Sequence, residues 1–246
     1  MLTRVHHVGL VVRRLEDGLA FWQDRLGLRI SKQATVVDQG VKAALLPIGR
    51  SEIELLEPIS NEGGVGKFLE KRGEGLHHVC FETADVDGEL AGARERGFPL
   101  IDQTPRPGLA GMICFLHPKG TAGVLVEFAT PPAGEHAHAA QGHGPLAGLA
   151  LRDVVAASKA ARDAAALFES KLGLTRVDDA TVTVGGVRLH FVAGQAEGLS
   201  GLVLELPDIA AATRALAPLA PAAANDGTLS LAPERCHGVP ITIVGS

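Results

Sequence analysis

The sequence predicts an α+β fold of paired β-α-β-β-β modules in two tandem domains, the second of them degenerate. The string VHHVGL at residues 5–10 has a counterpart, LHHVCF, at residues 76–81, and each opens a run of β-branched and apolar residues typical of a strand. A glutamate within an apolar run is repeated too, as Glu54 and Glu127. The second histidines of the two strings are 71 residues apart and the glutamates 73. The two spacings nearly agree, which indicates an internal repeat.

The first module begins with a strand over residues 5–12. Apolar residues at helical spacing then predict a helix over 15–26, which Gly27 ends as a left-handed cap residue does. Three further strand-like runs complete the module, at 28–32, 40–47 and 52–57.

The second module repeats this order after a short connecting helix, expected over 65–71. We expect a strand over 76–83 and a helix over 86–96 that Gly97 ends. The remaining strands are expected at 100–103, 111–116 and 123–128, with turns at 105–108 and 117–120. The two modules together form a domain over residues 1–130.

A linker is predicted over residues 131–144, where Pro, Gly and Ala are interspersed with histidines. His136, His138 and His143 are candidates for metal binding, as in other His-rich tracts. Solvated histidines in a flexible linker are the expected state.

The second domain, over 145–246, repeats the pattern with less similarity. Its string KLGL at 171–174 matches RLGL at 25–28, although its first helix is expected to be about two turns longer. The alignment sets Leu146, His190, Gly201 and Thr242 opposite the histidines and glutamates of the first domain. We therefore expect the second domain to keep the fold without metal ligands.

Composition and charge exclude several classes of protein. The formal net charge of −5 provides no basic excess for nucleic acid. The three cysteines are odd in number and widely spaced, which predicts free thiols in a reducing compartment. The sequence shows neither a signal peptide nor an apolar run long enough to span a membrane, so a cytoplasmic protein is expected.

The duplicated side chains predict a metal site in the first domain. Two imidazoles and two carboxylates suit a divalent ion such as Zn, Co, Ni, Mn or Fe. One donor on each of four strands lets the paired modules converge on a single ion, with ligands His7, Glu54, His78 and Glu127. Strand alternation directs the neighbouring His6 and His77 to the opposite face.

The residues also resemble a known family. The strings HHVGLVV (6–12), DQGV (38–41), IELLEP (53–58), GLHHVC (75–80), FLHPK (115–119) and GVLVE (123–127) are similar to those of methylmalonyl-CoA epimerases. That family belongs to the vicinal oxygen chelate superfamily, with glyoxalase I and the extradiol dioxygenases. The resemblance covers residues 3–129, and residues 145–246 resemble only the superfamily's fold.

The resemblance implies the same four metal ligands and an enolate chemistry. The family has Gln or Glu where this chain has Glu54, usually Asp where it has His6, and in some members a second-base Glu where it has Ala43. The implied substrate is methylmalonyl-CoA or a similar 2-carboxyacyl-CoA, whose α-proton is removed beside a metal-bound thioester.

Epimerisation needs a proton to leave one face of the carbon and return on the other. Glu127 is the first candidate for one of the two acid–base groups. Asp38, Glu54 and a water held by Gln39 are candidates on the opposite face. Cations expected near the CoA phosphates are Lys67, Lys71, Arg72, Arg106 and Lys119.

Three other functions share the fold: a glyoxalase I-like lyase, an extradiol dioxygenase with two histidines and one carboxylate on Fe(II), and a non-catalytic small-molecule-binding protein. The second domain is expected to pack on the first and to replace the partner subunit of single-domain relatives. Monomer and homodimer both remain open.

Overall fold

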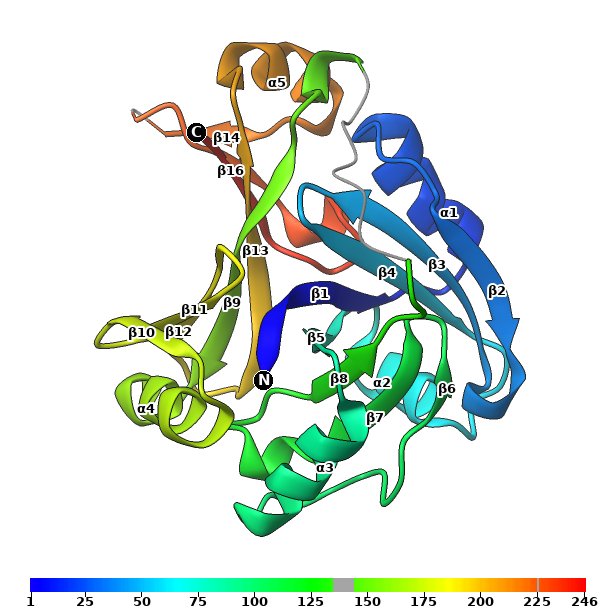
Figure 1. Cartoon of the computed structure of the whole chain (residues 1–246). Helices are drawn as coiled ribbons and strands as arrows, with labels where there is room; N and C mark the ends of the chain where they lie inside the picture. The colour runs from blue at the N-terminus through cyan, green and yellow to red at the C-terminus, as the bar shows by residue number, and fades with distance from the viewer. Residues whose placement is uncertain (135–143, 225) are drawn as a thin grey trace. The chain divides into compact units, whose positions relative to one another are not determined.

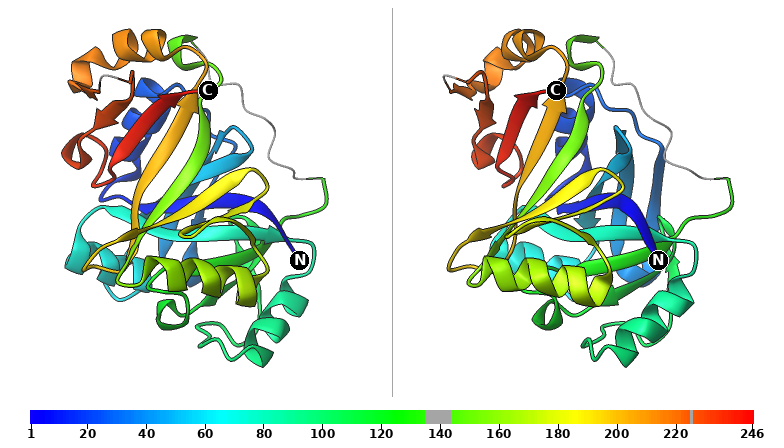
Figure 2. Two further views of the ribbon diagram at one scale, coloured as in Figure 1. Left: turned by 90° about the vertical axis from the view of Figure 1, so that its left-hand side faces the viewer. Right: turned by 60° about the vertical axis from the view of Figure 1, so that its left-hand side comes forward.

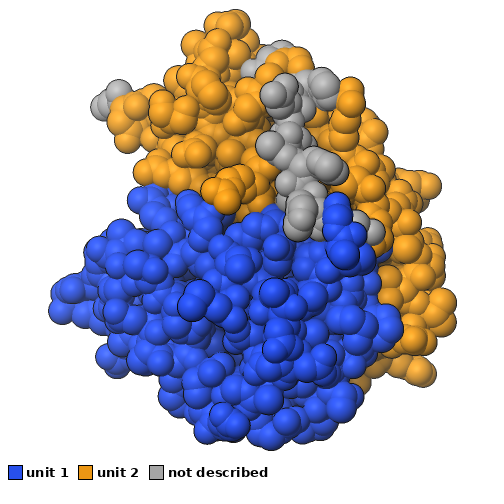
Figure 3. Space-filling view, viewed as in Figure 1, with its two compact units in different colours: residues 1–8, 78–136, 153–200 blue, residues 9–77, 137–152, 201–246 orange. Residues whose placement is uncertain are grey.

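The structure, a computed structural model, describes residues 1–134, 144–224 and 226–246. The chain forms two compact units (Figure 3). Unit 1 comprises Met1–Val8, His78–His136 and Asp153–Ser200, and unit 2 comprises Gly9–His77, Ala137–Arg152 and Gly201–Ser246. The three histidines of the predicted linker, His136, His138 and His143, lie outside the described residues.

Each half of the sequence supplies eight strands in the described regions. The first half has β1 Leu2–Val11, β2 Lys32–Val36, β3 Val41–Ile48, β4 Ser51–Pro58, β5 Gly75–Thr83, β6 Arg106–Gly108, β7 Gly111–Leu116 and β8 Val126–Thr130. The second has β9 Ala150–Ser158, β10 Thr175–Asp178, β11 Thr181–Val184, β12 Val187–Ala193, β13 Gly198–Leu206, β14 Ala222–Ala223, β15 Leu229–Leu231 and β16 Ile241–Gly245.

The two halves fold with the same strand order (Figure 1). The first sheet runs β2-β3-β4-β1-β5-β8-β7-β6 and the second β10-β11-β12-β9-β13-β16-β15-β14. Replacing each strand of the first sheet by its counterpart in the second half gives the second order. This identity confirms the predicted α+β fold of tandem, paired β-α-β-β-β modules.

Short helices connect the strands. They are α1 Leu15–Leu19, continued by a π-helical turn η1 Ala20–Arg25, then α2 Gly64–Arg72, α3 Val86–Glu95, α4 Ala161–Leu172 and α5 Ile209–Leu216. Turns of 3₁₀ helix are η2 Val37–Gln39, η3 Pro118–Gly120, η4 Gly144–Leu146, η5 Ala217–Leu219 and η6 Pro233–Arg235. Among the described residues, no helix is long and apolar enough to cross a membrane.

Each helix covers strands of its own unit. In unit 1, α3 packs on β7 and β8, and α4 runs along β10, β11 and β12 (Figure 2). In unit 2, α1 packs on β3 and β4, and α5 on β16. Trp22 is fully buried in the first helical segment. Phe168 of α4 packs against Phe191 of β12, with ring centroids 5.1 Å apart and an interplanar angle of 57°.

Two strands differ from the sequence-based expectation. The strand expected over 28–32 begins only at Lys32, as β2, because the Leu28 N–H donates to the carbonyl of Trp22 and closes the preceding helical turn. Residues 100–103 form only one bridge, at Leu100, since the carboxylate of Asp102 accepts the N–H of Phe115 where a ladder bond would lie. The edge strand β6 instead uses Arg106–Gly108, a stretch that its Pro and Gly had marked as a turn.

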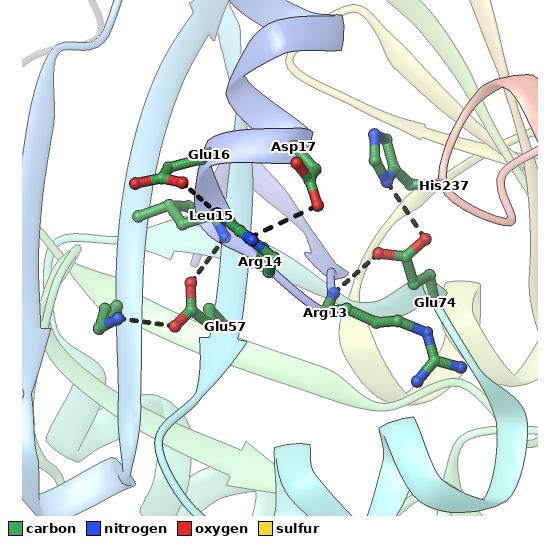
Figure 4. A network of polar contacts seen from close by, with 9 residues as sticks. Arg13, Arg14, Leu15, Glu16, Asp17, Glu57, Glu74 and His237 are labelled. Atoms are coloured by element: carbon green, nitrogen blue, oxygen red, sulfur yellow. Dashed lines mark hydrogen bonds and ion pairs between the residues drawn. The ribbon is translucent and has the colours of Figure 1, made fainter.

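Remote carboxylates hold the start of α1 (Figure 4). Its N-cap residue Arg14 makes no side-chain cap, which leaves the first N–H groups of the helix without a local partner. Glu57 Oε2 accepts the N–H of Leu15 at 2.7 Å, and Glu57 Oε1 pairs with Lys42 at 2.7 Å. One residue before the cap, Glu74 Oε1 accepts the N–H of Arg13 at 2.7 Å. Tertiary contacts therefore replace the missing cap.

The internal repeat extends to backbone detail in the loops before β8 and β16. In the first, Ala122 and Gly123 have φ of 51° and 82°, and in the second His237 and Gly238 have 53° and 76°. The N–H of each glycine donates to the carbonyl of the proline that opens the preceding 3₁₀ turn, at 2.9 Å in both loops. The two halves thus share a loop conformation that non-glycine residues adopt at a cost.

Helix starts identify the true counterpart of His7. His7 lies seven residues before Arg14, the N-cap of α1, and Asp153 lies seven before Ala160, the N-cap of α4. Leu146 falls in the turn η4, outside β9, so the alignment of Leu146 with His7 was wrong. The segments 15–25 and 161–172 are of similar length, so the third helix is not two turns longer. The discrepancy lies in the strand alignment.

Strand register supports the other three alignments. Thr181↔His190 repeats the pairing Leu45↔Glu54 across matching hairpins. Val203↔Thr242 likewise repeats Cys80↔Glu127, and Gly201 is the fourth residue of β13 as His78 is of β5. The second half therefore has Asp153, His190, Gly201 and Thr242 at the four positions.

Candidate metal centre

Three of the four predicted donors lie together in unit 1. His7 is on β1, His78 on β5 and Glu127 on β8, which are adjacent strands of the first sheet. In the parallel pairing of β5 with β8, Glu127 is opposite Cys80, which shares a face of β5 with His78. All three donors are almost fully buried, with exposed fractions of 0%, 2% and 3%.

The donor atoms form a tight triangle. His7 Nε2 and His78 Nε2 are 2.9 Å apart, and Glu127 Oε2 lies 3.2 Å from the first and 2.9 Å from the second. Ligands about 2.1 Å from an ion are spaced about 3.0 Å apart on an octahedral face and about 3.4 Å in a tetrahedron. The triangle therefore has the spacing of one face of an octahedron, and this donor set fits a divalent ion.

Electrostatics also favour an ionised carboxylate at this position. Burial by itself raises the pKa of Glu127, but the adjacent His7 and His78 outweigh it through charge and hydrogen bonding. The net result is a Glu127 pKa well below the usual range. Glu127 is therefore a ready anionic ligand.

An apolar wall supports the triangle from one side. The Phe115 ring meets His78 edge-on, with centroids 5.3 Å apart and an interplanar angle of 87°. Phe115 belongs to a buried cluster with Cys80, Ala110, Ile113 and Ala129. Packing against this cluster restricts rotation of the His78 ring and excludes water from its flank.

The other predicted site residues lie in unit 2, and their roles stay predictions. Glu54 is on β4, 6% exposed and opposite Leu45. Asp38 is exposed in the 3₁₀ turn η2, and Ala43 is buried on β3.

His6 and His77, which precede the predicted ligands His7 and His78, differ in their contacts. His77 stacks edge-on against Phe68, with ring centroids 5.0 Å apart, in keeping with a structural role. His6 is 5% exposed, and its Nδ1 lies 2.9 Å from Nδ1 of His7. The expectation that His6 points away from the site was therefore wrong. Strand alternation alone does not predict that His6 is buried in contact with His7.

The cations predicted near the CoA phosphates divide into two groups. Arg106 is engaged, through a 3.0 Å contact with Asp102 and by lying over the Phe115 ring. Arg72 lies over the ring of Phe68 but is itself exposed. Lys67, Lys71 and Lys119 are exposed on the surface.

Comparisons with known proteins agree with this geometry. Residues 6–115 match the model of the Glyoxalase/Bleomycin resistance protein/Dioxygenase superfamily. The chain is 37% identical over 136 residues to the uncharacterized protein YqjC of Bacillus subtilis, covering 55% of this chain and 97% of that one. It is 32% identical to the ethylmalonyl-CoA/methylmalonyl-CoA epimerase of Cereibacter sphaeroides, covering 52% of this chain and 97% of the relative.

A solved structure of methylmalonyl-CoA epimerase in complex with methylmalonyl-CoA and NH4+ is also similar. It has a TM-score of 0.53 and 38% identity, and the match covers 54% of this chain and 97% of that one. The relatives therefore match about half of this chain. These similarities show that the chain belongs to the Glyoxalase/Bleomycin resistance protein/Dioxygenase superfamily, the vicinal oxygen chelate proteins.

Proposed function

We propose that this protein is a metal-dependent epimerase of methylmalonyl-CoA or a similar 2-carboxyacyl-CoA. The observation that carries the proposal is the buried triangle of His7, His78 and Glu127, whose spacing suits an octahedral ion. Relatives named as epimerases of methylmalonyl-CoA and ethylmalonyl-CoA support the substrate class.

The three unit 1 residues would hold the ion, with Glu54 as the proposed fourth ligand. A bound divalent ion would supply a Lewis acid that stabilises the enolate formed from the thioester. Co, Zn, Ni, Mn and Fe all accept this set of imidazole and carboxylate donors. The remaining coordination positions would be open to substrate oxygens.

Epimerisation also needs acid–base groups, and we propose that the carboxylates of the site transfer the proton as well as bind the metal. Glu127 presents Oε2 to the two imidazoles, and we assign Oε1 to the substrate proton. The methyl side chain of Ala43 cannot act as an acid or base, so we assign the opposite face to Glu54, Asp38 or a water held by Gln39. A chain with only one working base would exchange the α-proton faster than it inverts the carbon.

The test compares exchange with inversion. Protein loaded in turn with Co, Zn, Ni, Mn and Fe is incubated in deuterium oxide with single-epimer methylmalonyl-CoA and ethylmalonyl-CoA. Deuterium at C2 with inversion supports the proposal, and deuterium without inversion indicates a single base. Absence of exchange with every ion overturns it. His7→Ala/His78→Ala is the matched variant and should lose both metal and exchange.

One observation favours a second candidate, an extradiol dioxygenase. Two histidines and one carboxylate on the face of an octahedron are the ligands of non-haem Fe(II) oxygenases, and unit 1 contains that set. Oxygen uptake by Fe(II)-loaded protein with catechol would support this alternative. Such uptake without acyl-CoA exchange would replace the epimerase proposal.

Partners and compartment follow from the same proposal. The CoA phosphates are proposed to lie near exposed cations such as Arg72 and Lys119. All three cysteines are free and buried, which supports a cytoplasmic location where thiols stay reduced.

A further inference from the structure

His6 is placed to act on a metal ligand without binding the metal itself. Its ring meets the His7 ring edge-on, with centroids 5.1 Å apart and an interplanar angle of 87°. The two Nδ1 atoms are 2.9 Å apart, a hydrogen-bond distance. Both side chains are buried, with exposed fractions of 5% and 0%, so bulk water does not compete for this contact.

The contact constrains the protons of both rings. Two ring nitrogens at this distance need one N–H and one lone pair, because two N–H groups or two lone pairs repel. His7 turns its other nitrogen, Nε2, toward His78 and Glu127. A nitrogen that ligates a metal must offer its lone pair, so the proton of neutral His7 then sits on Nδ1.

We propose that His6 is a positioning residue that accepts the Nδ1–H of His7 and so fixes the tautomer and rotation of this ligand. The inference rests on the metal centre of the proposed function. Most metal-bound histidines donate their second N–H to a carboxylate, a backbone carbonyl or water. In this chain a neutral imidazole fills that role, with its own proton on Nε2.

A different reading of the same atoms is a second metal site. His6, His7 and Cys80 each offer a donor atom within 4.8 Å of the others. That site would require His7 to ligate through Nδ1 while Nε2 serves the first site, and an imidazole that bridges two ions must lose both protons. The hydrogen bond uses each nitrogen once and leaves the ring neutral.

The test exploits a side chain of matching shape. The Asn side chain can place an oxygen, a hydrogen-bond acceptor, where His has Nδ1. Leu has the same shape as Asn but carries no hydrogen-bond acceptor. His6→Asn and His6→Leu are compared with the wild type for Zn²⁺ affinity by chelator competition. Thermal unfolding of the metal-free proteins checks that folding is comparable. We expect His6→Leu to bind Zn²⁺ about 10–100-fold more weakly and His6→Asn to recover most of this loss.

Two readouts separate the possible results. In Zn²⁺-loaded wild type, ¹⁵N spectra of the histidine rings should show a protonated His7 Nδ1, and the signal should shift in His6→Leu. Equal loss in both variants, or a deprotonated Nδ1, overturns the proposal. Two Zn²⁺ per wild-type chain and one in His6→Leu would establish the second site instead. Wild type that binds none of Zn²⁺, Co²⁺, Ni²⁺, Mn²⁺ and Fe²⁺ overturns both this inference and the proposed function, whereas binding without acyl-CoA exchange overturns only the latter.

Discussion

Glu74 and His237, separated by 163 positions in the sequence, are in contact in unit 2: Glu74 Oε2 lies 3.2 Å from His237 Nδ1 (Figure 4). The other oxygen of Glu74 accepts the N–H of Arg13, so this carboxylate, one residue before β5, contacts the segment between β1 and α1 and the loop before β16. Segments of both sequence halves are therefore integral to one compact unit.

The glycine next to His237 should be sensitive to any side chain. Gly238 has φ of 76°, and a Cβ added to it would lie 2.0 Å from the carbonyl oxygen of Glu74. Gly40 has φ of 66° and open space, so it isolates the cost of conformation. We expect Gly40→Ala to lower the unfolding free energy by about 1 kcal/mol. Gly238→Ala should lower it by about 1–3 kcal/mol more, because the added methyl group overpacks the site. Urea denaturation measures both, and equal costs would contradict the close approach.

Glu127→Gln should weaken metal binding while preserving shape. The amide keeps the size of the carboxylate but loses its charge and its strength as a ligand. We expect Zn²⁺ affinity to fall at least about 10-fold. Glu205→Gln, on β13 of the second sheet, is the control and should bind as the wild type does. Chelator competition measures both, and unchanged affinity in Glu127→Gln would remove Glu127 from the ligand set.

The lowered pKa of Glu127 predicts a pH dependence in the metal-free protein. Burial opposes ionisation, but His7 and His78 favour it, so the folded-state pKa lies below the reference value of 4.5. Such a group contributes stability above its unfolded pKa and loses that contribution as pH falls through the folded pKa. The difference in unfolding free energy between wild type and Glu127→Gln should therefore shrink as the pH falls below 4.5. If the difference in unfolding free energy grew as the pH fell, the Glu127 pKa would be raised rather than lowered on folding.

The thiols should be unreactive in the folded protein. Burial, followed by the charges of Asp102 and Glu127, raises the pKa of Cys114 to about 12. Burial and then Glu234 raise that of Cys236 to about 12. At pH 8 the thiolate fraction of these two cysteines is negligible. A thiol-reactive disulfide reagent should therefore not label the folded protein and should label it only once it is unfolded. Labelling in urea should then reach all three cysteines of the chain. A fast-reacting native thiol would contradict this burial.

The ion pair at the counterpart of His7 should stabilise unit 1. Asp153, 7% exposed, receives a two-point contact from the Arg188 guanidinium, with Nη2 2.6 Å from Oδ2. Asp153→Asn leaves the guanidinium without its anion, at a cost of about 1–3 kcal/mol after allowance for the partial exposure of Arg188. Asp153→Leu/Arg188→Met should recover much of this, because the double variant removes both charges of the pair. An equally unstable double variant would argue for a role beyond the pair.

Several features could be predicted from the sequence alone. Its repeats determine the module order, because strand and helix periodicities are local properties of the chain. The same repeats identify His7, His78 and Glu127, since residue type and strand position recur together. Gly27 and Gly97, both with positive φ, end the first helices of both modules as expected.

Only the tertiary structure decided the rest. Strand alternation directs His6 away from His7, yet the folded chain brings their Nδ1 atoms within 2.9 Å. Asp153 could not be matched to His7 from the sequence, because few residues of β9 resemble β1, whereas the helix starts define the correspondence. The contact of Glu74 with His237 likewise joins segments that share no local signal. Local patterns determine elements, but contacts between distant segments depend on how those elements pack.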